Sequence, residues 1–413
     1  GKVQNSRLSS GRWVKIRVSD NGIHMLTHSQ LKKMGFNDPT KVRLFGYGGH
    51  MLSESDTEAW IDDLCEVPLW RGTDRVLFYA RGSIEWTLKS DNTFTHTRNP
   101  YSDYGYYFLT ADGEGEPMAF PCSDALATSS SEIVTTPAYD LHEIDDYAWF
   151  HGGRQLVESY DFAGGHRRQY RLGASGIVGI RNTATLDVCF SHNGKSSSSV
   201  SIAVDSITLG NMTLSPIGSH SEASATTRSY KTNLVPKSPS GEVTVTLTHN
   251  RGTGVSGRLD YLRLSYTSYI GLNMPIYATG TGTHTYVVEA NKASVWNDNR
   301  VVWRITGATA MEQIPYDKAS NTFTAASTRG DVFIVVDEKA TYPTPEEVGE
   351  IANQNLHGTE PTDYIIIVPA SGKLTTQAER LAETHRTRSG LRTKVVRADE
   401  VYNEFSSGTP DAT

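Results

Sequence analysis

The chain has 413 residues, a formal net charge of −7 at pH 7 and a hydrophobic share of 37%, which suits a soluble protein of about two to four domains. The mild negative charge, with Lys and Arg spread along the chain, argues against nucleic acid as a partner. No run of about 18 apolar residues is present, so we expect no membrane-spanning segment. No signal peptide is visible; Gly1 resembles the residue that tag removal leaves, and we expect that a signal peptide was removed.

The three cysteines, Cys65, Cys122 and Cys189, lie far apart in the sequence. An odd and sparse count predicts neither a disulfide framework nor a zinc site built from closely spaced cysteine pairs. We therefore expect three unpaired thiols.

The first 140 residues are expected to form a β-rich N-terminal domain with a short helix. Residues 14–18 alternate apolar and polar side chains, with Lys15 and Arg17 in the polar positions, which predicts a half-buried strand. The turn residues that follow predict a hairpin with a second strand over residues 23–26.

A short helix is expected next, over residues 28–34, because Thr27 can cap its start and Gly35 can end it. Trp86 and Phe94 are expected in a hairpin. Further strands of this domain are expected over residues 42–45, 76–79 and 104–109.

A β-sandwich domain is expected over residues 141–270, after a loose connector at residues 111–140. Val243, Val245 and Leu247 alternate with threonine, which is the pattern of a strand with one face in a sandwich core. The expected strands span residues 184–190, 199–204, 229–234, 242–248 and 258–266.

More strands are expected over residues 271–345, where they either extend the sandwich or form a layer of their own. They span residues 285–289, 300–305 and 331–336. Pro343, Pro345 and the acidic pair Glu346 and Glu347 then predict a short helix.

Residues 346–413 have the pattern of the beginning of a doubly wound α/β domain. Residues 363–369 form a continuous apolar run, which is typical of a parallel strand covered on both faces. The elements expected to follow are a helix over residues 374–388, a strand over 391–397 and a helix over 398–405. A sheet of this kind needs several more strands, so we expect the natural protein to continue beyond Thr413.

The longer of these helices has recognisable ends. Thr375 or Thr376 can cap its start, and Gly390 stands where a left-handed residue would end it. His385 falls on its apolar face, where we expect a packing role. Asp399 is the expected cap of the last helix.

Several short stretches have the residue types of a functional site and also a simpler structural interpretation. Residues 46–49 (Gly-Tyr-Gly-Gly) follow a strand as a phosphate loop would, but no Lys-Ser/Thr or helix follows, which favours a tight loop. Cys189 and His192 have the spacing of half a zinc site, and the lack of a second half favours a buried cysteine and a turn histidine. The pairs Asp62–Asp63 and Asp337–Glu338 favour solvated surface.

The acidic segment of residues 142–146 is the richest of these stretches. It holds His142, Glu143, Asp145 and Asp146, which are all potential metal ligands or acid–base groups. Its composition favours a solvated, charged segment. We therefore assign no catalytic, cofactor-binding or metal-binding residue in this chain.

Three stretches of the chain are distinctive when taken together. The first is Gly11-Arg-Trp-Val-Lys-Ile-Arg-Val-Ser-Asp-Asn-Gly-Ile23, with residues 31–36, 42–46 and 101–109; the second is Leu259-Asp-Tyr-Leu262; the third joins residues 353–358, 363–367, 378–382, 395–396 and 401–408. On these stretches, which span nearly the whole chain, the sequence resembles the type IX secretion system sortases of Bacteroidetes, which are gingipain-type cysteine peptidases.

The resemblance implies a mainly β region followed by the first β-α-β-α units of a caspase-like α/β peptidase domain. It implies a secreted, outer-membrane-associated enzyme at the cell surface that removes the C-terminal sorting domain of cargo proteins and attaches the cargo to an anionic lipopolysaccharide. The implied partners are such cargo proteins and other components of the secretion system. In the family the catalytic His and Cys follow later strands, beyond Thr413, so we expect the complete protein to be a cysteine peptidase and this chain to lack catalysis. Calcium is implied only for the complete peptidase, and we expect no cofactor in this chain.

Two classes of function remain open for the residues present. One is a scaffold or docking region of a peptidase. The other is a carbohydrate-binding β-sandwich surface protein, which requires an exposed row of three or more aligned Trp or Tyr side chains.

Overall fold

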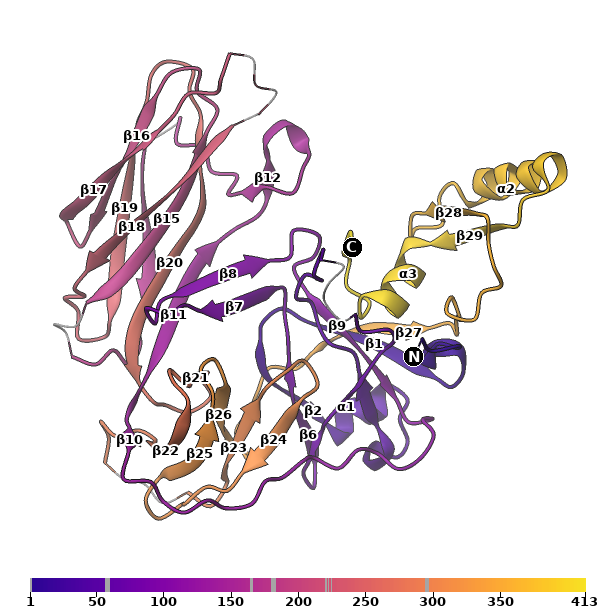
Figure 1. Ribbon diagram of the computed structural model, residues 1–413, viewed down its shortest axis with the longest axis horizontal. Helices are drawn as coiled ribbons and strands as arrows, with labels where there is room; N and C mark the ends of the chain where they lie inside the picture. Colours follow the sequence, from indigo (N-terminus) through magenta and orange to yellow (C-terminus); the bar gives the residue numbers. More distant parts are fainter. Residues whose placement is uncertain are drawn as a thin grey trace.

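The computed structural model describes residues 2–55, 60–163, 166–179, 183–219, 221, 223, 225–293 and 297–413. Strands hold 42% and helices 10% of it, which confirms the mainly β fold. Figure 1 shows several β regions joined in one large body, from which the last helices and strands extend to one side. None of the helices in the described ranges has the length and apolar character that a membrane crossing needs.

The N-terminal sheet has five strands in the order β27-β1-β9-β3-β4. Its members are β1 (Trp13–Val18), β3 (Arg43–Phe45), β4 (Glu66–Val67), β9 (Gly105–Thr110) and β27 (Glu346–Ile351). A second sheet, β2-β6-β5, packs on it and consists of β2 (Gly22–Thr27), β5 (Trp70–Arg71) and β6 (Arg75–Ala80). Helix α1 (His28–Lys33) begins at Thr27 with a capping box to Gln30, as the sequence predicts. The 3-10 helices are η1 (Arg7–Ser9), η2 (Pro39–Lys41) and η3 (Trp149–His151).

The predicted hairpin between residues 14–18 and 23–26 is wrong. β1 pairs with β9 and β27, whereas β2 pairs with β6. Val14 on β1 and Leu26 on β2 belong to the same core, so the chain turns from one sheet into the facing one and closes the core between them.

The predicted short helix at Glu346 and Glu347 is also wrong, because these residues begin β27. β27 pairs antiparallel with β1 in a register that sets Glu346 opposite Arg17. The two side chains form an ion pair at 2.9 Å, and Arg12 pairs with Glu350 at 3.0 Å. Cross-strand charge pairs of this kind stabilise a strand whose own β propensity is low.

The two-sheet domain follows, and its sheets enclose one apolar core. One sheet, in the order β11-β20-β15-β18, consists of β11 (Thr135–Glu143), β15 (Ala184–His192), β18 (Thr226–Leu234) and β20 (Gly257–Tyr269); the other, β14-β19-β16-β17, consists of β14 (Arg167–Gly173), β16 (Ser198–Val204), β17 (Ile207–Leu214) and β19 (Glu242–Asn250). A two-stranded ladder, β12 (Tyr147–Ala148) and β13 (Leu156–Val157), lies at its side. All five expected strands are present. β11 runs across the domain boundary expected at residue 140.

Residues 271–345 form sheets of their own. The sheet β21-β26-β23-β24 consists of β21 (Ile276–Tyr277), β23 (Arg300–Ile305), β24 (Met311–Ile314) and β26 (Val332–Asp337), and the sheet β10-β22-β25 consists of β10 (Glu132–Ile133), β22 (Gly282–Val287) and β25 (Thr322–Ser327). The first of these sheets is buried on both faces. Trp303 packs into the N-terminal core, and Val302 packs into a separate core toward the second sheet.

A hairpin links these parts. β7 (Ile84–Leu88) and β8 (Phe94–Arg98) pair as predicted, and Trp86 stacks on Tyr139 of β11 with ring centroids 3.6 Å apart. The hairpin therefore fixes the N-terminal block against the two-sheet domain (Figure 1).

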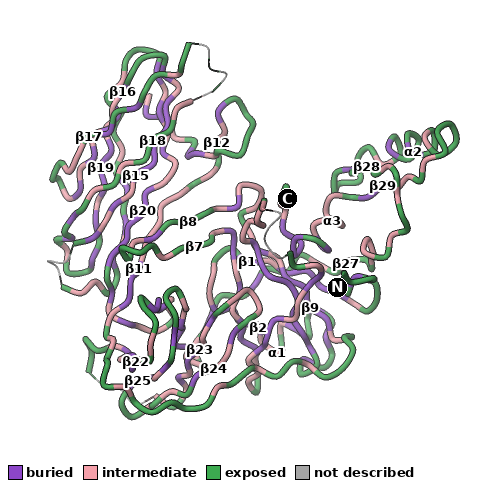
Figure 2. The backbone as a smooth tube through the Cα atoms, viewed as in Figure 1, coloured by how far each residue is buried: buried purple, intermediate pink, exposed green. Residues whose placement is uncertain are grey.

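The C-terminal elements are β28 (Tyr364–Val368), α2 (Thr375–Ser389), β29 (Thr393–Arg397) and α3 (Ala398–Phe405). β28 and β29 pair in parallel. The prediction that the first strand is covered on both faces is wrong, because Ile365 and Ile367 are 58% and 60% exposed. α2 covers one face of this two-stranded sheet, through the buried Ala378 and Ala382. Figure 2 shows that residues 363–397, which we call the arm, are mainly exposed or intermediate in burial.

The predicted helix starts need correction, and one predicted end is confirmed. Leu374, with φ 71°, precedes α2 and offers no capping side chain, so neither Thr375 nor Thr376 is the cap. Gly390 ends the helix with φ 67°, as predicted. Arg397, and not Asp399, precedes α3; its backbone N–H donates to Glu400.

Candidate functional site

The candidate site is built around residues 403–411, which we call the docked segment. Asn403 and Glu404 are 4% and 0% exposed, and Ser407 and Thr409 are 0% and 2% exposed. Buried polar groups are almost always hydrogen-bonded, and here the N-terminal sheet and its loops supply the partners.

Lys15 of β1 binds the docked segment. Its Nζ donates to Oδ1 of Asn403 at 2.8 Å and to the carbonyl of Gly408 at 3.1 Å, and it lies 4.6 Å from the centre of the Tyr106 ring. Burial lowers the pKa of Lys15 to about 8, although the charge of Asp399 opposes this. The expectation that Lys15 faces solvent is therefore wrong, because the docked segment covers that face of the strand.

Glu404 and His357 form a buried ionic contact beside it. Glu404 accepts from the backbone N–H of Leu356 at 2.7 Å and of His357 at 3.0 Å, and from His357 Nδ1 at 2.7 Å. His357 Nε2 donates to the carbonyl of Asp62 at 2.7 Å. Burial alone would lower the pKa of His357, but the bonds to Glu404 and Asp62 outweigh burial and raise it. Both ring nitrogens act as donors, which favours the charged imidazolium.

The Gly-Tyr-Gly-Gly stretch of residues 46–49 admits the docked segment. Ser407 Oγ accepts from the backbone N–H of Tyr47 at 2.9 Å. A Cβ at Gly46, where φ is 128°, would lie only 2.6 Å from that Oγ, so the close approach requires glycine. The tight-loop interpretation is confirmed, and the loop receives another segment of the chain.

The acidic segment of residues 142–146 sends its side chains to different places. His142 lies 3.2 Å from Glu158, and Asp146 accepts from the hydroxyl of Ser159 at 2.7 Å. Glu143 and Asp145 instead turn inward and meet Asp260 of β20. The three carboxylates each offer an oxygen within 4.8 Å of the others. The structure thus brings two of the four residues into one cluster, and the expectation of a solvated segment is wrong for Glu143 and Asp145.

A strand irregularity brings Asp260 to this cluster. Along β15, Cys189 is opposite Tyr261 and Phe190 is opposite Leu259, which leaves Asp260 as an extra residue in β20. Such a bulge redirects a side chain. Its carboxylate could not be assigned from sequence, because the alternation along β20 places no acidic site there.

Electrostatic repulsion shapes this cluster. Burial and then the charge of Glu143 raise the pKa of Asp145 to about 7, and burial with the charges of Glu143 and Asp145 raises that of Asp260 to about 7. His96 of β8 lies 2.8 Å from Glu143 and 2.9 Å from Arg263. Because Arg263 can only donate, His96 Nδ1 accepts and Nε2–H donates to Glu143.

The cysteine and histidine candidates do not converge. The Cys189 thiol lies 3.5 Å from Asp260, whereas His192 bonds to Ser215 at 2.8 Å and to Ser198 at 2.7 Å. His385 packs against the ring of Tyr364, with centroids 4.5 Å apart.

All three cysteines, Cys65, Cys122 and Cys189, are free, as expected. Burial, and then the charge of Asp260, raises the pKa of Cys189 to about 12, and burial raises that of Cys65. A thiol of this kind is a poor nucleophile because the thiolate is the reactive form.

The remaining acidic pairs have local structural roles. The expectation of solvated surface is wrong for Asp63, which is buried and accepts from the backbone N–H of Arg7 at 2.8 Å. Asp337 accepts from the backbone N–H of Lys339 at 2.9 Å in the turn after β26.

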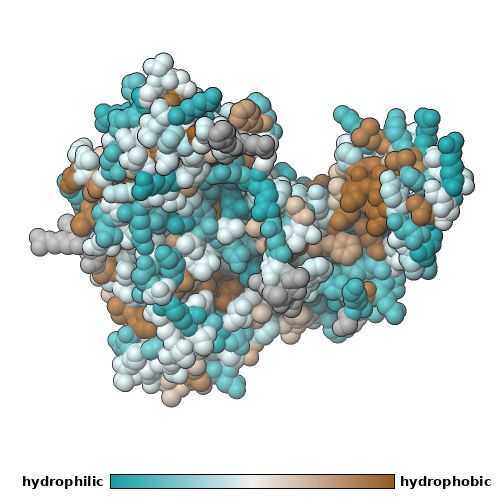
Figure 3. All heavy atoms as spheres, turned by 45° about the horizontal axis from the view of Figure 1, so that its top comes forward, coloured by the Kyte–Doolittle hydropathy of each residue, from teal (hydrophilic) through white to brown (hydrophobic). Residues whose placement is uncertain are grey.

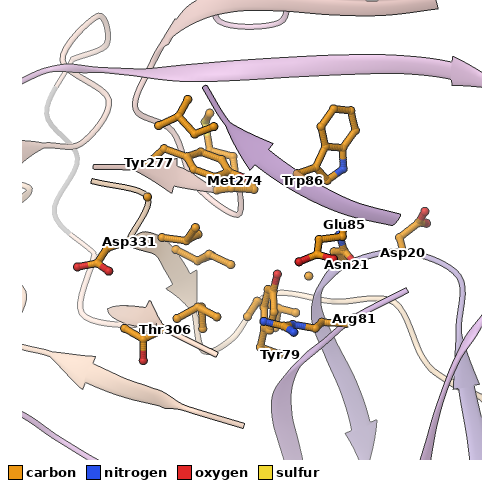
Figure 4. Close-up of a pocket in the computed structure, with 18 of the residues that line it drawn as sticks. Asp20, Asn21, Tyr79, Arg81, Glu85, Trp86, Met274, Tyr277, Thr306 and Asp331 are labelled. Carbon is orange, nitrogen blue, oxygen red and sulfur yellow. The ribbon is translucent and has the colours of Figure 1, made fainter. Parts of the chain in front are cut away.

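A cavity of about 590 Å³ opens between the N-terminal block, β7 and the sheet of β26. Figure 4 shows Asp20, Asn21, Glu85 and Arg81 on one side of it, and Asp331 and Thr306 on the other. Burial and the nearby charge of Arg81 lower the pKa of His50, which lines the cavity, to about 3. The lining is mixed polar and aromatic and holds no cysteine.

Comparison with known proteins adds a family and a fold. Residues 357–413 match the profile of peptidase family C25. The whole chain superposes on the crystal structure of dimeric latent PorU from Porphyromonas gingivalis with a TM-score of 0.85 and 28% identity, and it covers 39% of the PorU chain. The CBM36-1 domain of a multidomain xylanase from the hindgut metagenome of Trinervitermes trinervoides matches 24% of this chain and 68% of its own at 16% identity, but its TM-score of 0.18 carries no argument. No curated protein sequence matches the chain.

The docked segment and the arm lie within the C25 match, and the β regions before them take part in the PorU likeness. The resemblance expected from the sequence is therefore confirmed: the fold of this chain is that of part of PorU, and its last residues match the gingipain-type peptidase family C25.

Proposed function

We propose that this chain is the non-catalytic region of a type IX sortase, a cysteine peptidase at the cell surface. The likeness to PorU over the whole chain, with the family C25 match at residues 357–413, is the observation that carries the proposal. In this region the N-terminal sheet serves as a scaffold. It binds the docked segment through Lys15, and the docked segment follows the first elements of the peptidase domain.

The complete protein would remove the C-terminal sorting domain of secreted cargo and join the new end to an anionic lipopolysaccharide. Its partners would be cargo proteins with that domain and other components of the type IX system, at the outer membrane. The β regions of this chain would shield or dock the cargo.

The thiols of this chain support a non-catalytic role. Nucleophilic catalysis needs a thiolate beside a histidine base. Among the residues that the structure describes, no hydrogen bond joins a cysteine to a histidine, and the pKa of Cys189 is raised to about 12 because the thiol is buried and lies beside Asp260.

The experiment compares turnover of a peptide that spans a sorting-domain junction. It uses this chain, its Cys65→Ala/Cys122→Ala/Cys189→Ala variant and the full-length protein. We expect turnover only by the full-length protein. Turnover by this chain that the triple variant loses would place the active site among these three thiols and overturn the proposal.

The carbohydrate-binding alternative lacks its required feature. The large aromatic side chains that the described ranges expose are Trp60, Phe150 and Phe405, and they lie on separate elements. Trp86 of the β7–β8 hairpin stacks in parallel on Tyr139 of β11, so these two rings cover each other instead of forming an exposed row. A scaffold role therefore fits the surface better than a sugar platform.

A further inference from the structure

The carboxylates of Glu143, Asp145 and Asp260 converge where the β7–β8 hairpin meets the two-sheet domain. One oxygen of each lies within 4.8 Å of the other two. The cluster is separate from the docked segment and from the residues of the C25 match, so an inference drawn from it does not depend on the proposed function.

Asp145 lacks a partner that its burial requires. Its side chain is 9% exposed, and its Oδ2 lies 3.6 Å from Nε of Arg98. Its Oδ1 has no hydrogen-bond partner in the described part of the chain. Leaving a buried carboxylate oxygen without a donor or a cation costs free energy. The site therefore offers a free, inward-facing oxygen ligand.

The fixed cations nearby do not neutralise the cluster. Arg98 is shared between Asp145 and the exposed Asp103, and Arg263 is held by Asp187 at 3.3 Å. Three carboxyl groups thus face one guanidinium, and a bound cation would add the positive charge that the cluster lacks.

The donor atoms select a hard cation. The ligand atoms that converge are the carboxylate oxygens of Glu143, Asp145 and Asp260. An all-oxygen set suits Ca²⁺ or Mg²⁺. Ca²⁺ accepts about 6–8 oxygen ligands in a flexible geometry, whereas Mg²⁺ demands near-ideal octahedral geometry and keeps several waters. Three carboxylates from two strands and a loop therefore favour Ca²⁺.

We propose that Glu143, Asp145 and Asp260 bind a Ca²⁺ ion at the junction of the β7–β8 hairpin and the two-sheet domain. Water completes the coordination shell. Because Glu143 also accepts from His96 of the hairpin, the ion fixes the hairpin against β11 and β20. This site differs from the expectation that the chain holds no cofactor.

The test uses the whole chain after treatment with a chelator. Calorimetric titration with Ca²⁺ and separately with Mg²⁺ measures Kd, and thermal melting measures Tm. We expect one Ca²⁺ to bind with a Kd of about 1 mM or below, in the range of extracellular modules, and Mg²⁺ to bind at least about tenfold more weakly. Bound Ca²⁺ should raise Tm, because it binds the folded state.

Asp260→Asn is the decisive variant. It should weaken Ca²⁺ binding at least about tenfold and abolish the Tm increase. In chelator it should melt no lower than the wild type, because the neutral amide removes like-charge repulsion, and this separates lost binding from misfolding.

Asp187→Asn is the matched control. Asp187 is a carboxylate of the same sheet, 13% exposed, paired with Arg263 and outside the cluster. It should keep Ca²⁺ binding within about threefold of the wild type. The proposal is overturned if no saturable Ca²⁺ binding occurs up to about 10 mM, if Mg²⁺ binds as tightly as Ca²⁺, or if Asp260→Asn binds as well as the wild type.

Discussion

Two parts of the family-matching segment differ in how the rest of the chain covers them. The arm, residues 363–397, leaves Ile365 and Ile367 more than half exposed, and Figure 3 shows apolar side chains gathered there. In the docked segment, residues 403–411, six of the nine residues are buried, namely Asn403, Glu404 and residues 406–409, and most of them are polar or charged. The arm has an uncovered apolar surface, whereas the docked segment is covered by the rest of the chain.

The difference shows which part of the segment that matches family C25 the rest of the chain stabilises. The hydrophobic effect stabilises an α/β sheet fully only when both faces are covered. In the arm one face of the sheet is not covered. The docked segment depends instead on hydrogen bonds and charge pairs that are specific in direction. The N-terminal sheet therefore fixes the position of the β28–β29 sheet without covering it.

The largest expected effect comes from Glu404→Ala. Four donor contacts converge on this fully buried carboxylate, and its removal leaves the backbone N–H groups of Leu356 and His357 and the Nδ1 of His357 without their acceptor. Breaking a buried pair costs about 3–5 kcal/mol. Urea denaturation should show a loss of that size, with hydrogen exchange locating it in the docked segment.

The control for this loss is Glu379→Ala. Glu379 lies on α2 of the arm, 3.7 Å from Arg386 with 55% of its side chain exposed, and removal of such a surface pair should change stability by less than about 1 kcal/mol. Equal losses for the two variants would contradict the comparison.

Hydrogen exchange of the unmodified chain sharpens it. Amides of the docked segment should exchange at least about a hundredfold more slowly than those of β28, since local opening is easiest where little apolar surface is covered. The sequence alone predicts the whole of residues 363–413 to be the least stable part, and the structure restricts that prediction to the arm. Equal rates in β28 and the docked segment would show that the arm is covered as well.

Much of this fold follows from local patterns. The alternation of residues 242–248, the capping box at Thr27 and the left-handed Gly390 each predict what the structure contains. Local signals decide elements of this kind, because the interactions involved span only a few residues.

The failures that affect the candidate site concern distant partners, whereas the wrong helix starts before α2 and α3 are local. Lys15 occupies a polar position in the alternation of β1, which predicts that it faces solvent. Nothing near it in sequence indicates that Asn403 and Gly408 cover it. Glu346 has a helical composition, but Arg17 across the sheet decides for a strand. The acidic cluster likewise depends on Asp260, more than 100 residues from Glu143, and on a bulge that alternation does not reveal.

A pH titration tests the buried lysine. The pKa of Lys15 falls from an ordinary 10.5 to about 8 because the side chain is buried. Between these values the unfolded chain holds a proton that the folded chain has lost, so the unfolding free energy should rise with pH, by at most about 1.4 kcal/mol per pH unit. Below about pH 8 Lys15 is charged in both states, and its contribution to the slope should vanish.

Lys15→Met isolates this contribution. The variant keeps every other titrating group, so the difference between its unfolding free energy and that of the wild type should grow from about pH 8 to 10.5. Parallel curves over that range would mean that Lys15 is solvated and that the docked segment does not cover it.

The smallest effect is expected at the exposed face of the arm. Ile367→Thr keeps a β-branched side chain, so strand propensity changes little. With 60% of Ile367 exposed, little apolar surface is lost from contact, and the unfolding free energy should stay within about 0.5 kcal/mol of the wild type. In the full-length protein, where we propose that further peptidase elements cover this face, the same change should cost more, about 1–3 kcal/mol, because it places a hydroxyl in a buried apolar site. Urea denaturation of both proteins with and without the substitution measures the difference. Identical small effects in both would mean that the arm keeps its apolar face toward water in the complete protein, and then its cover is not what holds the peptidase sheet in place.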